Sequence, residues 1–159
     1  TITRWMIDID APPFWAAQLG QNEHVDRWQI IHFEAPSTIV IEVGVAPTGT
    51  GAPEGDRSRG VDGRVLKIMT PETEKFPAES WGFARNFELG SQARTHQIRE
   101  GVSSIFREDE AILERQQKAI DDNPDHVFYN LNIDAGSMWA RRLIDQMIAR
   151  EQTVRIAAE

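Results

Sequence analysis

One carboxylate in the sequence is set apart from the other acids by its neighbours. Asp109 is three or four residues away from each of four apolar side chains, which are Ile105, Phe106, Ile112 and Leu113. On a helix these spacings place the acid and the apolar side chains on one face, whereas Glu108 and Glu110 point roughly 100° to either side. The pattern predicts an amphipathic helix that turns one acid, Asp109, towards its buried side.

A carboxylate on a buried face has a restricted set of possible roles. Burying an unpaired charge is costly, so a cation, a proton or a dense set of hydrogen bonds must neutralise it. Asp109 is therefore either a structural residue, paired with an arginine such as Arg85 or bonded to backbone amides, or a metal ligand or catalytic acid. The residues alone leave both interpretations open.

The histidines limit what kind of metal site the chain can form. An oxygen-activating iron site needs two imidazoles and one carboxylate on one face of the metal. The four histidines, which are His24, His32, His96 and His126, include no closely spaced pair. His32 lies in a predicted strand, where it either faces a cavity or is a hydrogen-bonded core residue. We therefore expect that the chain cannot complete an iron site alone.

Composition excludes several other classes of function. The 159 residues include no cysteine, which rules out thiolate zinc sites and any iron–sulfur cluster bound by this chain itself. A formal net charge of −8 argues against nucleic acid or an anionic membrane surface as a partner. No apolar run approaches the roughly 20 residues that a membrane span needs. We expect a cytoplasmic protein, and the first residue, Thr1, suggests a piece of a longer chain.

The order of the predicted elements indicates the fold class. Alternating apolar residues predict strands, and the 3.6-residue period predicts helices, over these ranges: strands at 3–10, 27–34, 38–46, 63–70 and 79–87, and helices at 92–120 and 138–152. Residues 47–63 are rich in Gly, Pro, Asp and Ser and predict a long loop. Strands followed by helices, without alternation, predict an α+β fold with an antiparallel sheet.

Several short motifs resemble one enzyme family. APPFW, VDRWQI, IEVGVA, TPE, WGFARNF, IFREDEAILERQQ, LNIDAG and RRLID occur in this order, and together they resemble the catalytic domain of the Rieske non-haem iron oxygenases over almost the whole chain. The resemblance implies a helix-grip (START/Bet v 1-like) fold, in which a curved antiparallel sheet wraps around a long helix. It also implies a monooxygenase that demethylates a vanillate-like aryl methyl ether.

The resemblance assigns roles to particular positions. The family's carboxylate iron ligand lies in the Glu-Asp pair of the long helix, which places it on Asp109. Positions that line the substrate cavity match Ile41 and Lys67, and we also expect Val43 and His32 in that pocket. Lys67 differs in residue type from what the family leads us to expect.

The resemblance also implies groups that this chain does not contain. The Rieske domain with its [2Fe–2S] cluster, and both histidine ligands of the mononuclear Fe(II), are expected to precede Thr1. Residues 1–159 would then be part of the catalytic domain, with weak iron binding and no turnover alone. Expected partners are an aromatic substrate, dioxygen, a flavin and iron–sulfur reductase, and further subunits of a homotrimer.

Two other interpretations of the sequence stay open. One is a metal-free helix-grip module that binds a hydrophobic small molecule, with Asp109 as a structural or ligand-contacting acid. The other is a related oxygenase that acts on a different aromatic acid, because one fold hosts many activities.

Overall fold

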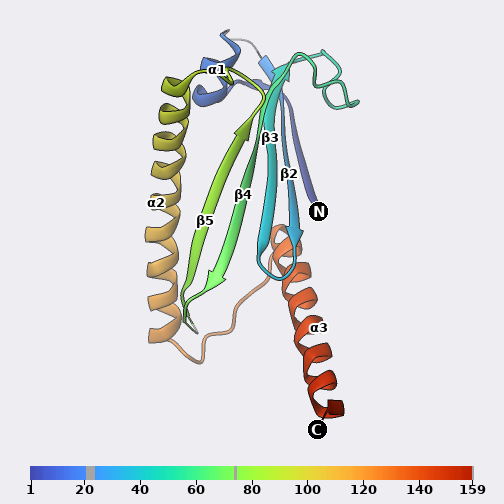
Figure 1. The fold of residues 1–159 in the computed structure, drawn as a ribbon, viewed down its shortest axis with the longest axis vertical. Helices are drawn as coiled ribbons and strands as arrows, with labels where there is room; N and C mark the ends of the chain where they lie inside the picture. Colours follow the sequence, from blue (N-terminus) through green and yellow to red (C-terminus); the bar gives the residue numbers. More distant parts are fainter. Residues whose placement is uncertain (21–23, 74, 159) are drawn as a thin grey trace. The chain divides into compact units, whose positions relative to one another are not determined.

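The chain forms an antiparallel sheet and three α-helices in the computed structural model, which describes residues 1–20, 24–73 and 75–158 (Figure 1). The strands are β1 (Ile2–Asp10), β2 (His24–Glu34), β3 (Thr38–Pro47), β4 (Val61–Pro71) and β5 (Pro77–Arg85). The helices are α1 (Pro13–Leu19), α2 (Gln92–Asp122) and α3 (Ala135–Ala158), with a short 3-10 helix η1 (Asn132–Asp134) before α3. This architecture confirms the predicted α+β class.

Two compact units make up the chain. The first consists of Thr1–Phe87 and Leu131–Glu159, and it holds the sheet, α1, η1 and α3. The second, Glu88–Asn130, holds α2. In the part of the chain that the structure describes, no helix is long and apolar enough to cross a membrane.

The sheet is an up-and-down meander in which the strands lie in sequence order, β1-β2-β3-β4-β5. Antiparallel partners point their side chains to the same side of a sheet. We call one side the Val43 face; it carries Ile41, Val43, Val65 and Phe83. The other side is the Trp28 face; it carries Trp28, His32, Glu42 and Gly44.

A small core covers one end of the Val43 face. Val25 and Val45 are fully buried there against Trp15 of α1, and further apolar side chains pack around them. Figure 1 shows α1 at the end of the sheet where β2 begins and β3 ends. The short helix therefore closes this end of the sheet.

On the Trp28 face, the long loop between β3 and β4 is fastened to the sheet. The Arg57 guanidinium lies over the rings of Trp5 and Trp28, 5.5 and 4.9 Å from their centroids. Its NH1 also donates to Oε2 of Glu42 at 3.3 Å. The loop predicted at 47–63 is thus confirmed, and one arginine ties it to an aromatic pair by charge and stacking.

β1 departs from the predicted alternation. The sequence places Trp5, Ile7 and Ile9 on one half-buried side, but Ile7 is 53% exposed. The register between β1 and β2 shifts between Met6 and Ile9, and Asp8 has a φ of 55°. Such a bulge changes the side to which the following side chains point.

α2 has the predicted start and end. Ser91 caps its first turn, and the helix stops before Asn123-Pro124. Its apolar stripe is less buried than expected: Ile98 is buried, but Ile105, Ile112 and Leu113 are 57%, 62% and 59% exposed. α3 is longer than the predicted 138–152, and its first turn brings Gly136 against the Ile2 side chain of β1.

Candidate functional site

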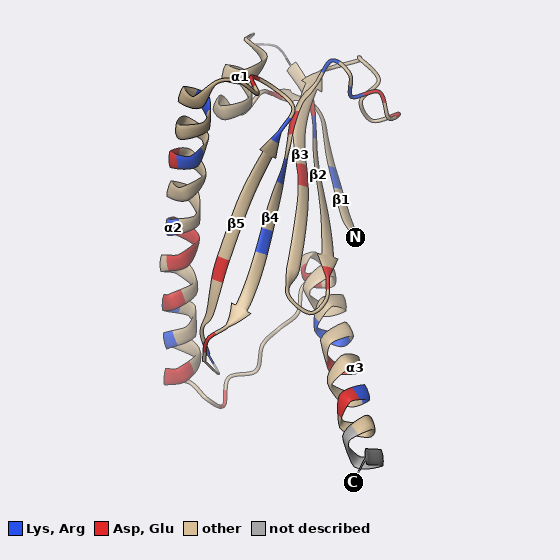
Figure 2. Cartoon of the chain, viewed as in Figure 1, with Lys and Arg blue, Asp and Glu red and all other residues tan. Residues whose placement is uncertain are grey.

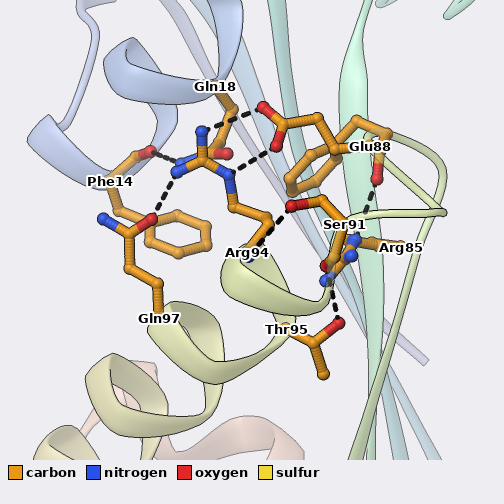
Figure 3. A network of polar contacts seen from close by, with 9 residues as sticks. Phe14, Gln18, Arg85, Glu88, Ser91, Arg94, Thr95 and Gln97 are labelled. Carbon is orange, nitrogen blue, oxygen red and sulfur yellow. Dashed lines mark hydrogen bonds and ion pairs between the residues drawn. The ribbon is translucent and has the colours of Figure 1, made fainter.

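A polar network holds the beginning of α2, the helix that carries Asp109 (Figure 3). The Ser91 hydroxyl accepts a hydrogen bond from the Arg94 backbone N–H at 3.1 Å. The Arg94 guanidinium donates to both carboxylate oxygens of Glu88, at 3.0 and 2.9 Å. These hydrogen bonds raise the pKa of Arg94 above its ordinary value. The helix therefore begins at a defined residue, which fixes the phase of every later position.

Asp109 lies in the middle of α2 on the face predicted for it, but the expectation that it is buried is wrong. The side chain is exposed, as are its neighbours Ile105 and Ile112. It forms neither a hydrogen bond nor an ion pair with any residue that the structure describes. Arg85, the arginine suggested as a structural partner, donates a hydrogen bond from its Nε to the Phe87 carbonyl at 2.8 Å.

Among the side chains that could bind a metal ion, α2 offers the single carboxylate of Asp109 at this position. Within residues 1–20, 24–73 and 75–158 no three His, Cys, Asp or Glu side chains come close enough to hold a metal ion together. Acidic and basic residues both recur along α2, whereas most of the sheet carries neither (Figure 2). Asp109 can contribute one of the three ligands that a two-histidine, one-carboxylate iron site needs. It has no hydrogen bond or ion pair with a described residue that would have to break first.

Three of the four predicted pocket residues share one side of the sheet. Ile41, Val43 and Lys67 all lie on the Val43 face. There Ile41 pairs with Val65, and the Lys67 ammonium lies 2.9 Å from a Glu79 carboxylate oxygen. These residues form an apolar surface with a neutralised ion pair beside it.

His32 is not grouped with the other three residues. It pairs with Val40 and so lies on the Trp28 face. Its Nδ1 is 3.2 Å from the Thr1 hydroxyl, and its Nε2 is 3.5 Å from a Glu42 carboxylate oxygen. Of the two alternatives for this histidine, the structure shows a hydrogen-bonded side chain beside an acid, on the opposite side from Ile41 and Val43.

Two arginines on the Val43 face are absent from the residues that the sequence singled out. Arg27 of β2 pairs with Val45, and Arg4 of β1 pairs with Gln29, which in turn pairs with Val43. The Arg27 Nε is buried without a hydrogen-bond partner. Burial, reinforced by the nearby charge of Arg4, lowers the pKa of Arg27. Alternation along β2, which places Arg27 and Gln29 on one side with Ile31, was the sequence signal for Arg27; placing Arg4 beside them also requires the register between β1 and β2.

Comparisons with known proteins agree with the motifs found in the sequence. The family model described as the vanillate O-demethylase oxygenase C-terminal domain matches residues 1–150. A vanillate O-demethylase oxygenase subunit from a Pseudomonas species is 40% identical over 98% of this chain and 46% of its own length. The iron-sulfur subunit of a toluene-4-sulfonate monooxygenase system from Comamonas testosteroni is 37% identical over 95% of this chain and 44% of its own.

A more distant relative is the oxygenase component of a chloroacetanilide N-alkylformylase from Rhizorhabdus wittichii. It is 27% identical over 99% of this chain and 45% of its own length. The chain spans about half the length of the curated relatives that it matches. No solved structure matches it.

The fold is that of an α+β domain in which a five-stranded antiparallel meander is followed by long helices. The chain belongs to the family of vanillate O-demethylase oxygenase C-terminal domains, which confirms the family resemblance seen in the sequence.

Proposed function

We propose that this chain is part of the catalytic domain of a Rieske non-haem iron monooxygenase that removes the methyl group of a vanillate-like aryl methyl ether. The observation that carries the proposal is the family match over residues 1–150, together with 40% identity to a vanillate O-demethylase oxygenase subunit. The activity belongs to the complete protein, to which this chain contributes one carboxylate and a substrate-facing surface.

In this proposal Asp109 is the carboxylate ligand of a mononuclear Fe(II). Its two imidazole ligands, and a [2Fe–2S] cluster that delivers electrons, come from residues outside this sequence. When bound, the iron supplies dioxygen activation, so that the methoxy carbon is hydroxylated and leaves as formaldehyde. The support for this role is the position of Asp109 in the Glu-Asp pair of α2, which the family resemblance assigns to the carboxylate iron ligand.

The Val43 face is proposed to contact the substrate. Ile41 and Val43 present apolar surface to an aromatic ring and exclude water from it. The Lys67–Glu79 pair gives this surface a polar edge whose charges cancel. His32 is left out of the proposed contact surface because it lies on the Trp28 face.

The wider assembly follows from the same family resemblance. We propose a helix-grip (START/Bet v 1-like) architecture, a homotrimeric complete oxygenase in the cytoplasm, and a separate flavin and iron–sulfur reductase as electron donor. Relatives named as an oxygenase subunit and an oxygenase component support a multicomponent system.

The decisive experiment replaces Asp109 in the full-length protein. We expect Asp109→Ala to lower the mononuclear iron content and the demethylation rate more than tenfold, since even indirect partners of metal ligands change affinity by about 10–100-fold. Iron is measured by elemental analysis and demethylation by formaldehyde release. The visible absorbance of the [2Fe–2S] cluster reports whether the variant is folded.

Glu108→Ala is the matched control, because Glu108 is the adjacent acid and is also exposed on α2. It should keep both iron and activity, since its side chain points roughly 100° away from Asp109. Full iron occupancy and unchanged demethylation in Asp109→Ala would reject the ligand role. The reverse pattern, loss only in Glu108→Ala, would move the ligand to Glu108.

A further inference from the structure

The cations on the Val43 face differ in whether they have partners. Lys67 is paired with Glu79, and Arg85 donates to the Phe87 carbonyl. Arg4 and Arg27 form no hydrogen bond or ion pair with any part of the chain that the structure describes. Two neighbouring positive charges therefore lie on this surface without an anionic partner among the described residues.

This arrangement is costly without a ligand. A guanidinium carries several N–H donors and keeps its charge in proteins, so it cannot relieve the cost by losing a proton. The buried Arg27 Nε has no acceptor, and an unsatisfied buried donor is expensive. The closeness of Arg4 adds repulsion between like charges. Burial, and after it this repulsion, lower the pKa of Arg27. An anion between the two groups would remove both costs.

The neighbouring positions indicate the rest of the ligand. Gln29 lies beside Arg4 in the register and pairs on its other side with Val43. Beyond Val43 is Gly63, whose missing side chain leaves room for the Phe83 ring. A polar, positively charged patch thus borders directly on an apolar and aromatic one.

We propose that Arg4 and Arg27 bind the carboxylate of an aromatic acid, whose ring lies on Ile41 and Val43. This rests on the proposed function and adds to it the group by which the substrate is selected. A planar carboxylate suits two guanidinium forks, which can each donate two parallel hydrogen bonds. The same patch does not select a neutral ring that lacks an anionic substituent.

The test measures equilibrium binding to the full-length protein of vanillate and of its neutral counterpart, vanillyl alcohol, by calorimetry. Wild-type protein should prefer the acid roughly ten- to hundredfold, the range of a hydrogen bond to a charged group. Arg27→Gln and Arg4→Gln should each lower vanillate affinity about tenfold or more and leave the affinity for the alcohol unchanged. Arg4 is exposed, so its variant keeps the test valid if Arg27→Gln does not fold.

Arg64→Gln is the matched control, because Arg64 is an exposed arginine on the Trp28 face, 3.6 Å from Glu42. It should leave both affinities unchanged. The proposal would be overturned if the wild type bound the acid and the alcohol equally, or bound neither. It would also be overturned if the arginine variants lost affinity for both compounds equally, or kept the preference of the wild type for the acid. Vanillate affinity that stays the same or rises in the variants would overturn it as well.

The outcome is separable from that of the oxygenase proposal, since binding is measured without turnover. If Asp109→Ala retains iron and activity but acid preference depends on Arg4 and Arg27, the anion site stands and the iron assignment fails. If Asp109→Ala loses iron but the preference ignores both arginines, only the anion site is rejected.

Discussion

At the scale of single residues, Gly44 is a position at which the sheet leaves no room for a side chain. It pairs with Trp28, and the indole ring of that fully buried residue fills the space in which a Cβ on Gly44 would lie. The same ring is covered by Arg57. The absence of one side chain therefore lets the largest core residue lie flat on the sheet.

We expect Gly44→Ala to lower the free energy of unfolding by about 1–3 kcal/mol, the usual cost of overpacking. Urea denaturation followed by tryptophan fluorescence measures it. Gly82→Ala is the control, because a Cβ at Gly82 on β5 meets no atom within 4 Å, and it should change stability by less than about 0.5 kcal/mol. Equal effects at the two sites would contradict this account of Gly44.

At the scale of elements, α2 depends on how its first turn is fixed. The Ser91 hydroxyl satisfies one backbone N–H, and the Arg94–Glu88 ion pair holds the segment just before the helix. The first backbone N–H groups of a helix have no partner within the helix, so a capping side chain contributes directly to the stability of the first turn.

Replacing the cap should loosen the start of α2. Ser91→Ala is expected to destabilise the first turn by about 1 kcal/mol and to speed amide exchange there roughly fivefold, measured by hydrogen–deuterium exchange. Ser104→Ala, at an exposed position inside the helix, should slightly raise helix stability instead. Identical exchange in the two variants would argue against capping by Ser91.

The elements that the sequence predicts well are those set by local rules. The end of α2 follows from Asn123-Pro124, and its start follows from Ser91. The bulge in β1 does not follow from its own residues, because it depends on the Asp26 carboxylate of β2, which accepts a hydrogen bond from the Asp8 backbone N–H at 3.1 Å. Contacts between distant segments decide such departures.

In the candidate site, too, local sequence patterns predict some features, and contacts between distant segments decide the others. Helical periodicity predicts the face on which Asp109 lies, but not its exposure, which depends on what packs against that face. Alternation separates His32 from Ile31 along β2. Placing Ile31 on the side of Ile41 also requires the hairpin register, and a shift of one residue would exchange the sides. The arginine pair was missed for this reason.

At the scale of the whole molecule, the balance of protons between folded and unfolded chains makes stability depend on pH. Burial raises the pKa of Asp62, and Glu42 adds to the effect, while Arg57 and Arg64 oppose it. Asp56 behaves in the opposite way: hydrogen bonds from Ser58 lower the pKa of this carboxyl group. The two acids lie six residues apart, so they form a natural pair of probes.

We expect the stability of the wild type relative to Asp62→Asn to be greatest at acidic pH. A pKa raised on folding means that the folded chain binds more protons, so this contribution is present below the ordinary carboxyl pKa and is lost as pH rises through the raised value. Asp56→Asn should show the opposite slope, because the contribution of Asp56 is lost as pH falls through its lowered pKa. Denaturant unfolding at a series of pH values measures both; slopes of the same sign would contradict the assignment.

The meander also determines how the chain can be made. Every ladder of the described sheet joins strands that follow each other in the sequence, so each hairpin can form as soon as its second strand leaves the ribosome. Short sequence separation between contacting residues favours rapid folding, and assembly from the N-terminus leaves few strand edges waiting for distant partners. The sheet can thus form before α3 has left the ribosome.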